Sequence, residues 1–252
     1  MAGHSKWANI KHRKAKQDAK RSKIFTSIIK DLTIAARDGG ADPNFNPALR
    51  LAVQNAKGAN MPKDTIEKAI KKGAGGEGAN LQLVTYEGYG PYGIALFVEA
   101  TTDNINRTVA NVRAIFNKYN GNLGTNGSLS FIFDQKGIFE IPEENIAGTD
   151  RDDMELELIE MGAEEIDWSE GTITLTTAFE DFGKMQKELD AKGIELKSAH
   201  VRRIPKSTSV LEVQEALKLL KMIEKFEEDD DVTTVYHNLE LTSELITELE
   251  KE

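Results

Sequence analysis

The 252-residue chain contains no cysteine, so it can form no disulfide framework, no thiolate nucleophile and no cysteine-based metal site. A reducing cytosol suits such a chain. No run approaches about 18 consecutive apolar residues, which argues against a membrane-spanning helix. The basic first residues also lack the apolar core of a secretory signal. We therefore expect a cytoplasmic protein with no membrane partner.

Patterns that would support catalysis are equally scarce. The four histidines stand at positions 4, 12, 200 and 237, without the close spacing of metal ligands. The acidic run from Glu227 to Asp231 lies in a turn context, where carboxylates serve caps and solvation. The glycine-rich segment 73–80 follows a helix and lacks the Lys-Ser/Thr of a phosphate-binding loop, so a flexible linker explains it better. We expect no enzyme activity, no metal and no cofactor.

Charge is distributed very unevenly along the chain. The net charge is −10, yet residues 3–25, GHSKWANIKHRKAKQDAKRSKIF, hold eight Lys or Arg and only one acid, Asp18. Residues 1–75 contain sixteen bases and six acids, whereas the remainder contains sixteen bases and thirty-six acids. This separation indicates a basic module that binds a polyanion and an acidic body held away from it.

The first 78 residues are typical of a small helical domain. Residues 23–40 repeat apolar side chains at helical spacing and end in two glycines. Segment 46–58 opens with Asn-Pro, a helix cap followed by a residue suited to the first helical position, and closes in glycine. Segment 61–73 has capping-box spacing and also closes in glycine.

Beyond the linker the pattern changes to strands. Residues 137–206 read strand, helix, strand, strand, helix, strand, the ferredoxin-like order. Residues 79–136, with a last strand over 128–134, and residues 207–240 complete each other as another α/β sandwich, because neither closes a layer alone. Residues 241–252 form a C-terminal tail. The predicted fold class is α+β and multidomain: an N-terminal all-helical domain, then two ferredoxin-like α/β sandwich domains, the second inserted into the first.

The basic N-terminal segment is the first candidate nucleic-acid site. A helix that is polar nearly all round gains little from packing, so we expect the segment to order on its partner. A solvated surface helix is the alternative, but it does not explain the single sign of charge. Contacts with phosphates do, because each neutralised phosphate releases counterions. Trp7 stacks on a base or anchors the segment to the helical core. The predicted contacts are His4, Lys6, Trp7, Lys11, His12, Arg13, Lys14, Lys16, Lys20, Arg21 and Lys23.

A second lysine cluster surrounds the sequence GANMPKD. Ordinary positions on a helix surface explain these lysines as well as a binding role does. Their closeness in sequence to the first cluster, and the Gly/Pro loop between two helices, favour a shared function. The further predicted contacts are Lys57, Lys63, Lys71 and Lys72.

Four long motifs carry a resemblance to a known family. Residues 1–25, DPNFNPALRLAVQNAKGANMPKDTIEKAIKKG, YEGYGPYGIALFVEATTDNINRTVANVR and GSLSFIF resemble the YebC family, which includes the mitochondrial translational activator of cytochrome c oxidase subunit I. The resemblance implies three domains and a regulator of gene expression rather than an enzyme. Members are described as DNA-binding transcriptional regulators or as ribosome-associated factors that help translation through consecutive prolines. Mitochondrial members carry a presequence before GHSKW, so this start implies a bacterial, cytoplasmic protein.

Physical arguments favour RNA as the partner. We find no clear pair of helices joined by the short turn of a helix-turn-helix that offers Arg, Asn or Gln to base edges. A lysine-rich segment suits backbone contact, and an acidic body beside a compact basic end suits a crowded ribosomal site. No coiled-coil heptad indicates a symmetric dimer, so we expect a monomer that binds ribosomal RNA or tRNA on the ribosome.

Two alternatives remain open. Sequence-independent backbone contacts would serve duplex DNA equally well, which makes a DNA-binding transcriptional regulator the main alternative. The third hypothesis is a protein-interaction scaffold whose basic end meets an acidic protein.

Overall fold

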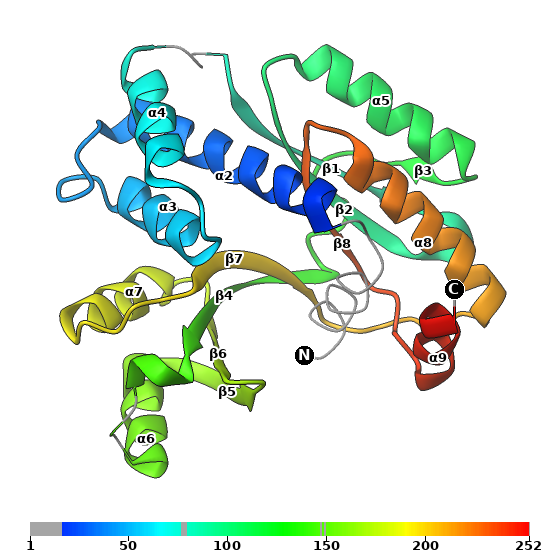
Figure 1. Ribbon diagram of the computed structural model, residues 1–252. Helices are drawn as coiled ribbons and strands as arrows, with labels where there is room; N and C mark the ends of the chain where they lie inside the picture. Colours follow the sequence, from blue (N-terminus) through cyan, green and yellow to red (C-terminus); the bar gives the residue numbers. More distant parts are fainter. Residues whose placement is uncertain (1–16, 77–79, 147, 149, 252) are drawn as a thin grey trace. The chain divides into compact units, whose positions relative to one another are not determined.

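The computed structural model describes residues 17–76, 80–146, 148 and 150–251 (Figure 1). It has the predicted α+β class, with two four-stranded sheets. The described chain falls into two compact units. The first unit takes the residues up to Lys30, those from 80 to Asp134 and those from Ile204 onward; the second takes Asp31 to 76 and Gln135 to Arg203. The predicted division into a helical domain and two α/β domains stays a prediction.

The first unit is built on a sheet with the strand order β3-β1-β2-β8, in which each adjacent pair is antiparallel. Helices α5 and α8 cover one face of this sheet, and α9 lies next to α8 (Figure 1). Its elements are α2 (Gln17–Gly39, as far as Lys30), β1 (Gln82–Tyr89), the 3-10 turn Pro91–Gly93, β2 (Ala95–Thr102), α5 (Ile105–Lys118), β3 (Asn122–Leu123), α8 (Val213–Glu228), β8 (Val232–His237) and α9 (Ser243–Lys251).

Strand β2 is buried on both faces, which explains its nearly continuous apolar sequence. Leu96 and Val98 face the helices and share a core with Phe116 of α5 and Phe226 of α8, whose ring centroids lie 5.1 Å apart. On the other face, Phe97 joins a smaller cluster with Ala95, Leu129, Phe133 and Tyr236.

The second unit contains the strand order β5-β6-β4-β7, with helices α6 and α7 against the sheet. This is the order expected of the predicted βαββαβ segment. Its core includes Phe139, Leu158, Leu175 and Leu189. Its elements are the remainder of α2, α3 (Pro47–Gly58), α4 (Lys63–Ala74), β4 (Phe133–Pro142), the 3-10 turn Glu143–Ile146, α6 (Arg151–Met161), β5 (Ala163–Ser169), β6 (Thr172–Ala178), α7 (Phe182–Ala191) and β7 (Ser198–Pro205).

Two predicted elements differ from the observed ones. Residues 128–132 are a run of turns rather than a strand, with Ile132 N–H bonding the carbonyl of Leu129; strand β4 begins at Phe133 and continues into the segment read as inserted. Leu129 and Phe133 are buried four residues apart, as a turn places them. The residues read as a tail contain α9, because Leu245 and Leu249 lie one turn apart and pack into the first unit's core.

Candidate nucleic-acid interface

Most of the predicted N-terminal contacts lie outside the described residues. These are His4, Lys6, Trp7, Lys11, His12, Arg13, Lys14 and Lys16, and their roles stay predictions. Lys20 lies within α2, but the description of side chains begins at Arg21. Arg21 is exposed, with its guanidinium carbon 5.2 Å from the centroid of the Phe25 ring. It can therefore reach solvent or a ligand from the first described turns of α2.

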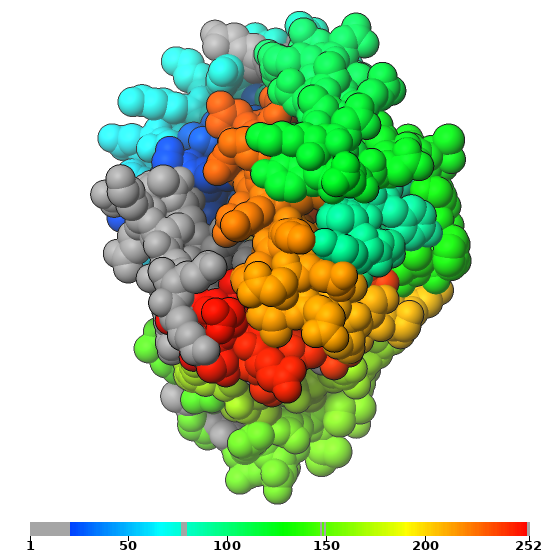
Figure 2. Space-filling model, turned by 90° about the vertical axis from the view of Figure 1, so that its right-hand side faces the viewer, coloured from blue at the N-terminus to red at the C-terminus, as the bar shows by residue number. Residues whose placement is uncertain are grey.

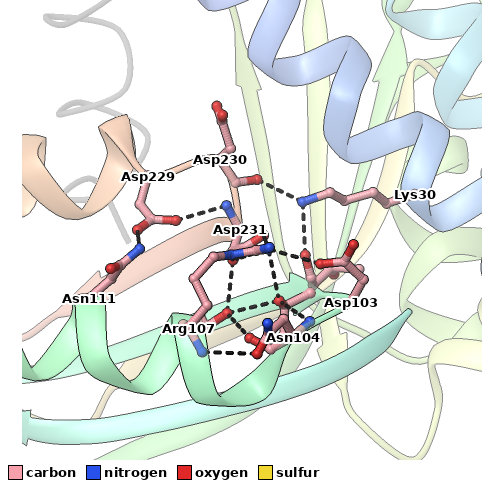
Figure 3. A network of polar contacts seen from close by, with 11 residues as sticks. Lys30, Asp103, Asn104, Arg107, Asn111, Asp229, Asp230 and Asp231 are labelled. Atoms are coloured by element: carbon pink, nitrogen blue, oxygen red, sulfur yellow. Dashed lines mark hydrogen bonds and ion pairs between the residues drawn. The ribbon is translucent and has the colours of Figure 1, made fainter. Parts of the chain in front are cut away.

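Lys23 and Lys30 hold the first half of α2 against the rest of the first unit. Lys23 Nζ donates to the carbonyl of Asp229 at 3.0 Å. Lys30 Nζ donates to the carbonyls of Thr101 and Asp230, at 2.8 and 2.6 Å. Two ammonium groups thus bond backbone oxygens of one turn and of the end of β2. Figure 3 shows the two bonds of Lys30. Lys23 was predicted as a nucleic-acid contact, and its observed partner gives it a role in positioning the helix that continues from the basic segment.

The same turn contains a buried carboxylate. Asp231 is 6% exposed and receives three bonds from Arg107 at the start of α5. Arg107 Nη2 lies 2.7 Å from Oδ2 and 2.8 Å from Oδ1, and Arg107 Nε lies 3.1 Å from Oδ2. The hydroxyl of Thr108 lies 2.8 Å from Oδ2. Arg107 also bonds Asp103 at 2.9 Å, and Asn111 bonds Asp229 at 2.9 Å (Figure 3). The first two turns of α5 are thereby tied to a turn more than 100 residues away.

The protonation of Asp231 follows from these contacts. Burial acts to raise the pKa of this carboxyl, but the bonds from Arg107 and Thr108 outweigh it, so the pKa of Asp231 is lowered. The aspartate is an ionised structural anchor. The sequence reading of the run Glu227 to Asp231 as solvating carboxylates was wrong for Asp231, because a contact partner 124 residues away cannot be read from local pattern.

The second lysine cluster lies in the second unit on α3 and α4. Lys57, Lys63, Lys71 and Lys72 are all exposed, and so is Lys68. Lys63 Nζ is 3.6 Å from a carboxylate oxygen of Glu67, a contact that at such exposure contributes little. The other four lysines make no ion pair within the part of the chain that the structure describes.

Close packing turns these lysines outward. Gly73 lies on the buried face of α4, where a Cβ would come within 2.2 Å of the Thr33 carbonyl oxygen. Only glycine lets α4 approach α2 this closely. Because helix positions 63, 68, 71 and 72 lie away from this contact, α4 presents four lysines with two acids, Asp64 and Glu67, to solvent.

Helices α3 and α4 are joined by only four residues, 59–62. From the sequence we expected no clear pair of helices that combines a short turn with a helix offering Arg, Asn or Gln to base edges; the short turn is present here. The turn depends on Asn60, whose φ is 56°, and on Met61, whose N–H bonds the carbonyl of Ala56. The exposed face of α4 carries lysines and acids but none of the Arg, Asn or Gln residues that commonly read base edges. This pair of helices suits phosphate contact better than base recognition.

Among the residues that the structure describes, no group of three or more His, Asp or Glu side chains could hold a metal ion. Within the same residues, no helix is long and apolar enough to cross a membrane.

Comparison with known proteins assigns the chain. Residues 5–76 match the TACO1/YebC protein N-terminal domain, and residues 81–239 match the TACO1/YebC second and third domain. The chain belongs to the TACO1/YebC family.

Relatives in this family match over nearly their full length. A probable transcriptional regulatory protein of Amoebophilus asiaticus is 51% identical over 95% of this chain and 98% of its own. One from Idiomarina loihiensis is 46% identical over 99% of this chain and all of its own. The crystal structure of a conserved hypothetical protein, Aq1575 from Aquifex aeolicus, is 41% identical, with a TM-score of 0.79 over 94% of this chain and 97% of that one.

The family boundaries fit the elements of the structure. The TACO1/YebC N-terminal domain includes the basic segment, α2, α3 and α4, and so contains both predicted lysine clusters. The second and third domain includes both sheets and ends at residue 239, just before α9. The resemblance read from the four sequence motifs is thereby confirmed.

Proposed function

We propose that this protein is a non-enzymatic, nucleic-acid-binding regulator of gene expression that acts on RNA at the ribosome and eases stalls at consecutive prolines. The observation that carries the proposal is the separation of charge: eight bases and one acid in residues 3–25 of a chain with a net charge of −10. A compact basic end attracts a polyanion, and an acidic body prevents the protein from being wrapped in it.

The described lysines support this proposal. Lys57, Lys68, Lys71 and Lys72 are exposed ammonium groups on two short helices, matched to a sequence-independent phosphate backbone. Relatives carry names of regulatory proteins, which agrees with a regulator and a non-enzyme.

Promoter DNA is the second candidate target. Relatives are named probable transcriptional regulatory proteins, and α3 and α4 are joined by a turn of helix-turn-helix length. Lysines on the exposed face of α4 would grip a duplex without reading it, so sequence-specific operator binding needs residues that this face does not offer.

The binding site is tested by salt dependence. Replacing Lys11, Arg13, Lys14 and Lys16 by Ala should weaken binding to purified ribosomes and lower the slope of log K against log salt by about three, because up to four phosphate contacts are lost. A matched control replaces four bases outside both clusters, Lys184, Lys187, Lys192 and Lys218, and should keep the slope. An unchanged slope in the N-terminal variant would remove that segment from the site.

The target is decided by ribosome profiling with and without the gene. Pausing at proline runs that appears only in its absence supports the ribosomal role. Altered transcript levels without altered pausing would instead support the transcriptional role.

A further inference from the structure

The stretch from Asn104 to Phe133 has an unusual composition for this part of the chain. Beyond residue 75 about one residue in five is acidic, yet these thirty residues contain no Asp or Glu. They contain Arg107, Arg113 and Lys118, together with seven asparagines. All seven asparagines are exposed: Asn104, Asn106, Asn111, Asn117, Asn120, Asn122 and Asn126. Solubility alone does not require amides in place of the acids that cover the remainder of this body.

Helix α5 concentrates this composition on one outward face. Thr108, Val112 and Phe116 are buried against the sheet. With a turn of about 100° per residue, Asn106, Arg113 and Asn117 then lie together on one side of the exposed Ala110 and Ala114, and Lys118 lies on the other side. Figure 2 shows the green atoms of α5 at the surface, next to the orange atoms of α8.

Only some of the polar groups of α5 help to hold the fold, among the residues that the structure describes. Arg107 is engaged by Asp231, Asn111 by Asp229, and Asn104 caps the helix. Arg113 and Lys118 make no ion pair, and the side chains of Asn106 and Asn117 make no hydrogen bond, with any other residue in the described ranges. Lys118 Nζ lies 5.7 Å from the centroid of the Tyr119 ring.

The surface continues past the end of α5. Asn120 turns the chain with a φ of 57°, and Asn122 then pairs in register with Tyr89 of β1, a residue that is 37% exposed. Tyr89 therefore stands beside an exposed amide at the edge of the sheet. Asn106, Arg113, Asn117 and Lys118 form an exposed strip along α5 that leads to Tyr89, and it is called the strip below.

We propose that this strip is a second RNA contact surface, separate from the basic N-terminal segment. It rests on the proposed function, since it requires that the chain meets RNA. Arg113 and Lys118 would bond phosphates, and the small side chains of Ala110 and Ala114 let a sugar–phosphate backbone lie close to the helix. An exposed tyrosine ring gives a base a face to stack on.

The amides distinguish RNA from other polyanions. An asparagine both donates and accepts, as does the 2′-hydroxyl of ribose, which DNA lacks. Duplex DNA is gripped chiefly through many phosphate contacts, and two unengaged cations are too few for that. An acidic peptide would likewise favour a surface of several lysines over one of asparagines.

The test uses two double variants, one that adds negative charge to the amides and one that reverses the charge of the two cations. Asn106→Asp with Asn117→Asp is nearly isosteric, and Arg113→Glu with Lys118→Glu reverses two charges at exposed positions. We expect the first variant to bind purified ribosomes and a single-stranded poly(U) RNA several-fold more weakly, and the second about tenfold more weakly. The control, Lys184→Glu with Lys187→Glu on α7, changes the net charge as much as the second variant and should stay within about twofold of wild type. Thermal melting confirms that each variant is folded.

The outcomes separate this inference from the proposed function. Unchanged RNA binding in both strip variants, together with weakened binding in the N-terminal alanine variant, overturns the second surface and leaves the function standing. Wild-type protein that binds neither ribosomes nor RNA overturns both. If the strip variants lose as much affinity for polyglutamate, or for a DNA duplex of the same length as the poly(U) RNA, as they lose for that RNA, the assignment to RNA is overturned.

Discussion

At the scale of the residue, Asp231 shows how a carboxylate in an acidic turn can stabilise rather than solvate. Its side chain is buried and accepts hydrogen bonds from Arg107 and Thr108. Lys30 donates to the carbonyl of the neighbouring Asp230. Its ionised form is favoured because each bond is made to charged oxygen, so the pKa of Asp231 is lowered despite burial. The Asp231 side chain therefore joins α5 to the turn before β8, and the backbone of the same turn bonds Lys30 of α2.

Removing either partner of this pair should destabilise the first unit. We expect Arg107→Ala to lower the free energy of unfolding, because it leaves the buried Asp231 carboxylate with fewer donors. Asp231→Asn keeps an acceptor and should cost about 1–2 kcal/mol. Urea unfolding of both single variants and the double variant measures this. Losses that simply add in the double variant would contradict a direct coupling.

His200 on β7 gives the second unit a dependence on pH. Burial, with help from Arg202 and against the pull of Glu140, lowers the pKa of His200 to about 4. Its ordinary value is 6.5, so the unfolded chain takes up a proton at a pH where the folded chain does not. Stability should therefore be full above about pH 6.5 and should fall as the pH drops toward 4.

This loss is expected to reach about 1–3 kcal/mol at pH 4.5, since the side chain keeps some contact with solvent. Urea unfolding between pH 7.5 and 4.5 measures it, and His200→Gln should flatten the profile in that window. A slope that survives the substitution would show that another group titrates there.

At the scale of the element, α3 is held against β7 by a side chain that bonds the backbone N–H and carbonyl of the edge strand. Asn55 donates to the carbonyl of Ala199 at 3.0 Å and accepts from its N–H at 2.8 Å, closing the edge of β7. One turn on, a Cβ on Gly58 would come within 1.7 Å of the carbonyl oxygen of Lys197. Helix and strand thus approach through an amide and a glycine, and the exposed Lys57 lies between them in sequence.

Substitutions at this contact should loosen α3 from the sheet. Asn55→Leu leaves an N–H and a carbonyl of the edge strand without their partner, and should cost about 2–4 kcal/mol. Gly58→Ala forces the backbones apart, at a cost of at least about 2 kcal/mol. Chemical denaturation measures both, with Lys57→Ala as a neighbouring control that should change stability by less than about 0.5 kcal/mol. Near-native stability of both variants would show that α3 is not held here.

At the scale of the whole molecule, the basic end and the acidic body are expected to be separable. Among the described residues, the core of the first unit's sheet begins at Tyr86, and that of the second unit's sheet begins at Phe139, with the partly buried Leu51 packed against it. Deleting residues 1–22 should therefore leave both sheets folded, with cooperative melting, while binding to ribosomes is lost. A broad, non-cooperative transition in calorimetry would contradict the predicted division of the chain.

The sequence by itself determined the elements that depend on local pattern. The Asn46 cap and a closing glycine located α3, and apolar runs located β1, β2 and the βαββαβ segment. The capping box expected at Asp64 and Glu67 was wrong, because α4 begins at Lys63 after Pro62 with no side-chain cap. Four motifs identified the family. The charge separation that carries the proposed function is also a property of sequence alone. Residues 128–132 and α9 were misread because short apolar stretches fit a turn, strand or helix equally until a packing partner decides.

Only the tertiary structure decided which residues meet across long separations. It placed Arg107 on Asp231, Lys23 and Lys30 on the turn at 229–231, and Asn55 on Ala199. It also showed that the asparagines of α5 face solvent while its apolar residues face the sheet. The reason is physical: helices and strands follow from forces between near neighbours, whereas burial and pairing between distant segments exist only once the chain has folded.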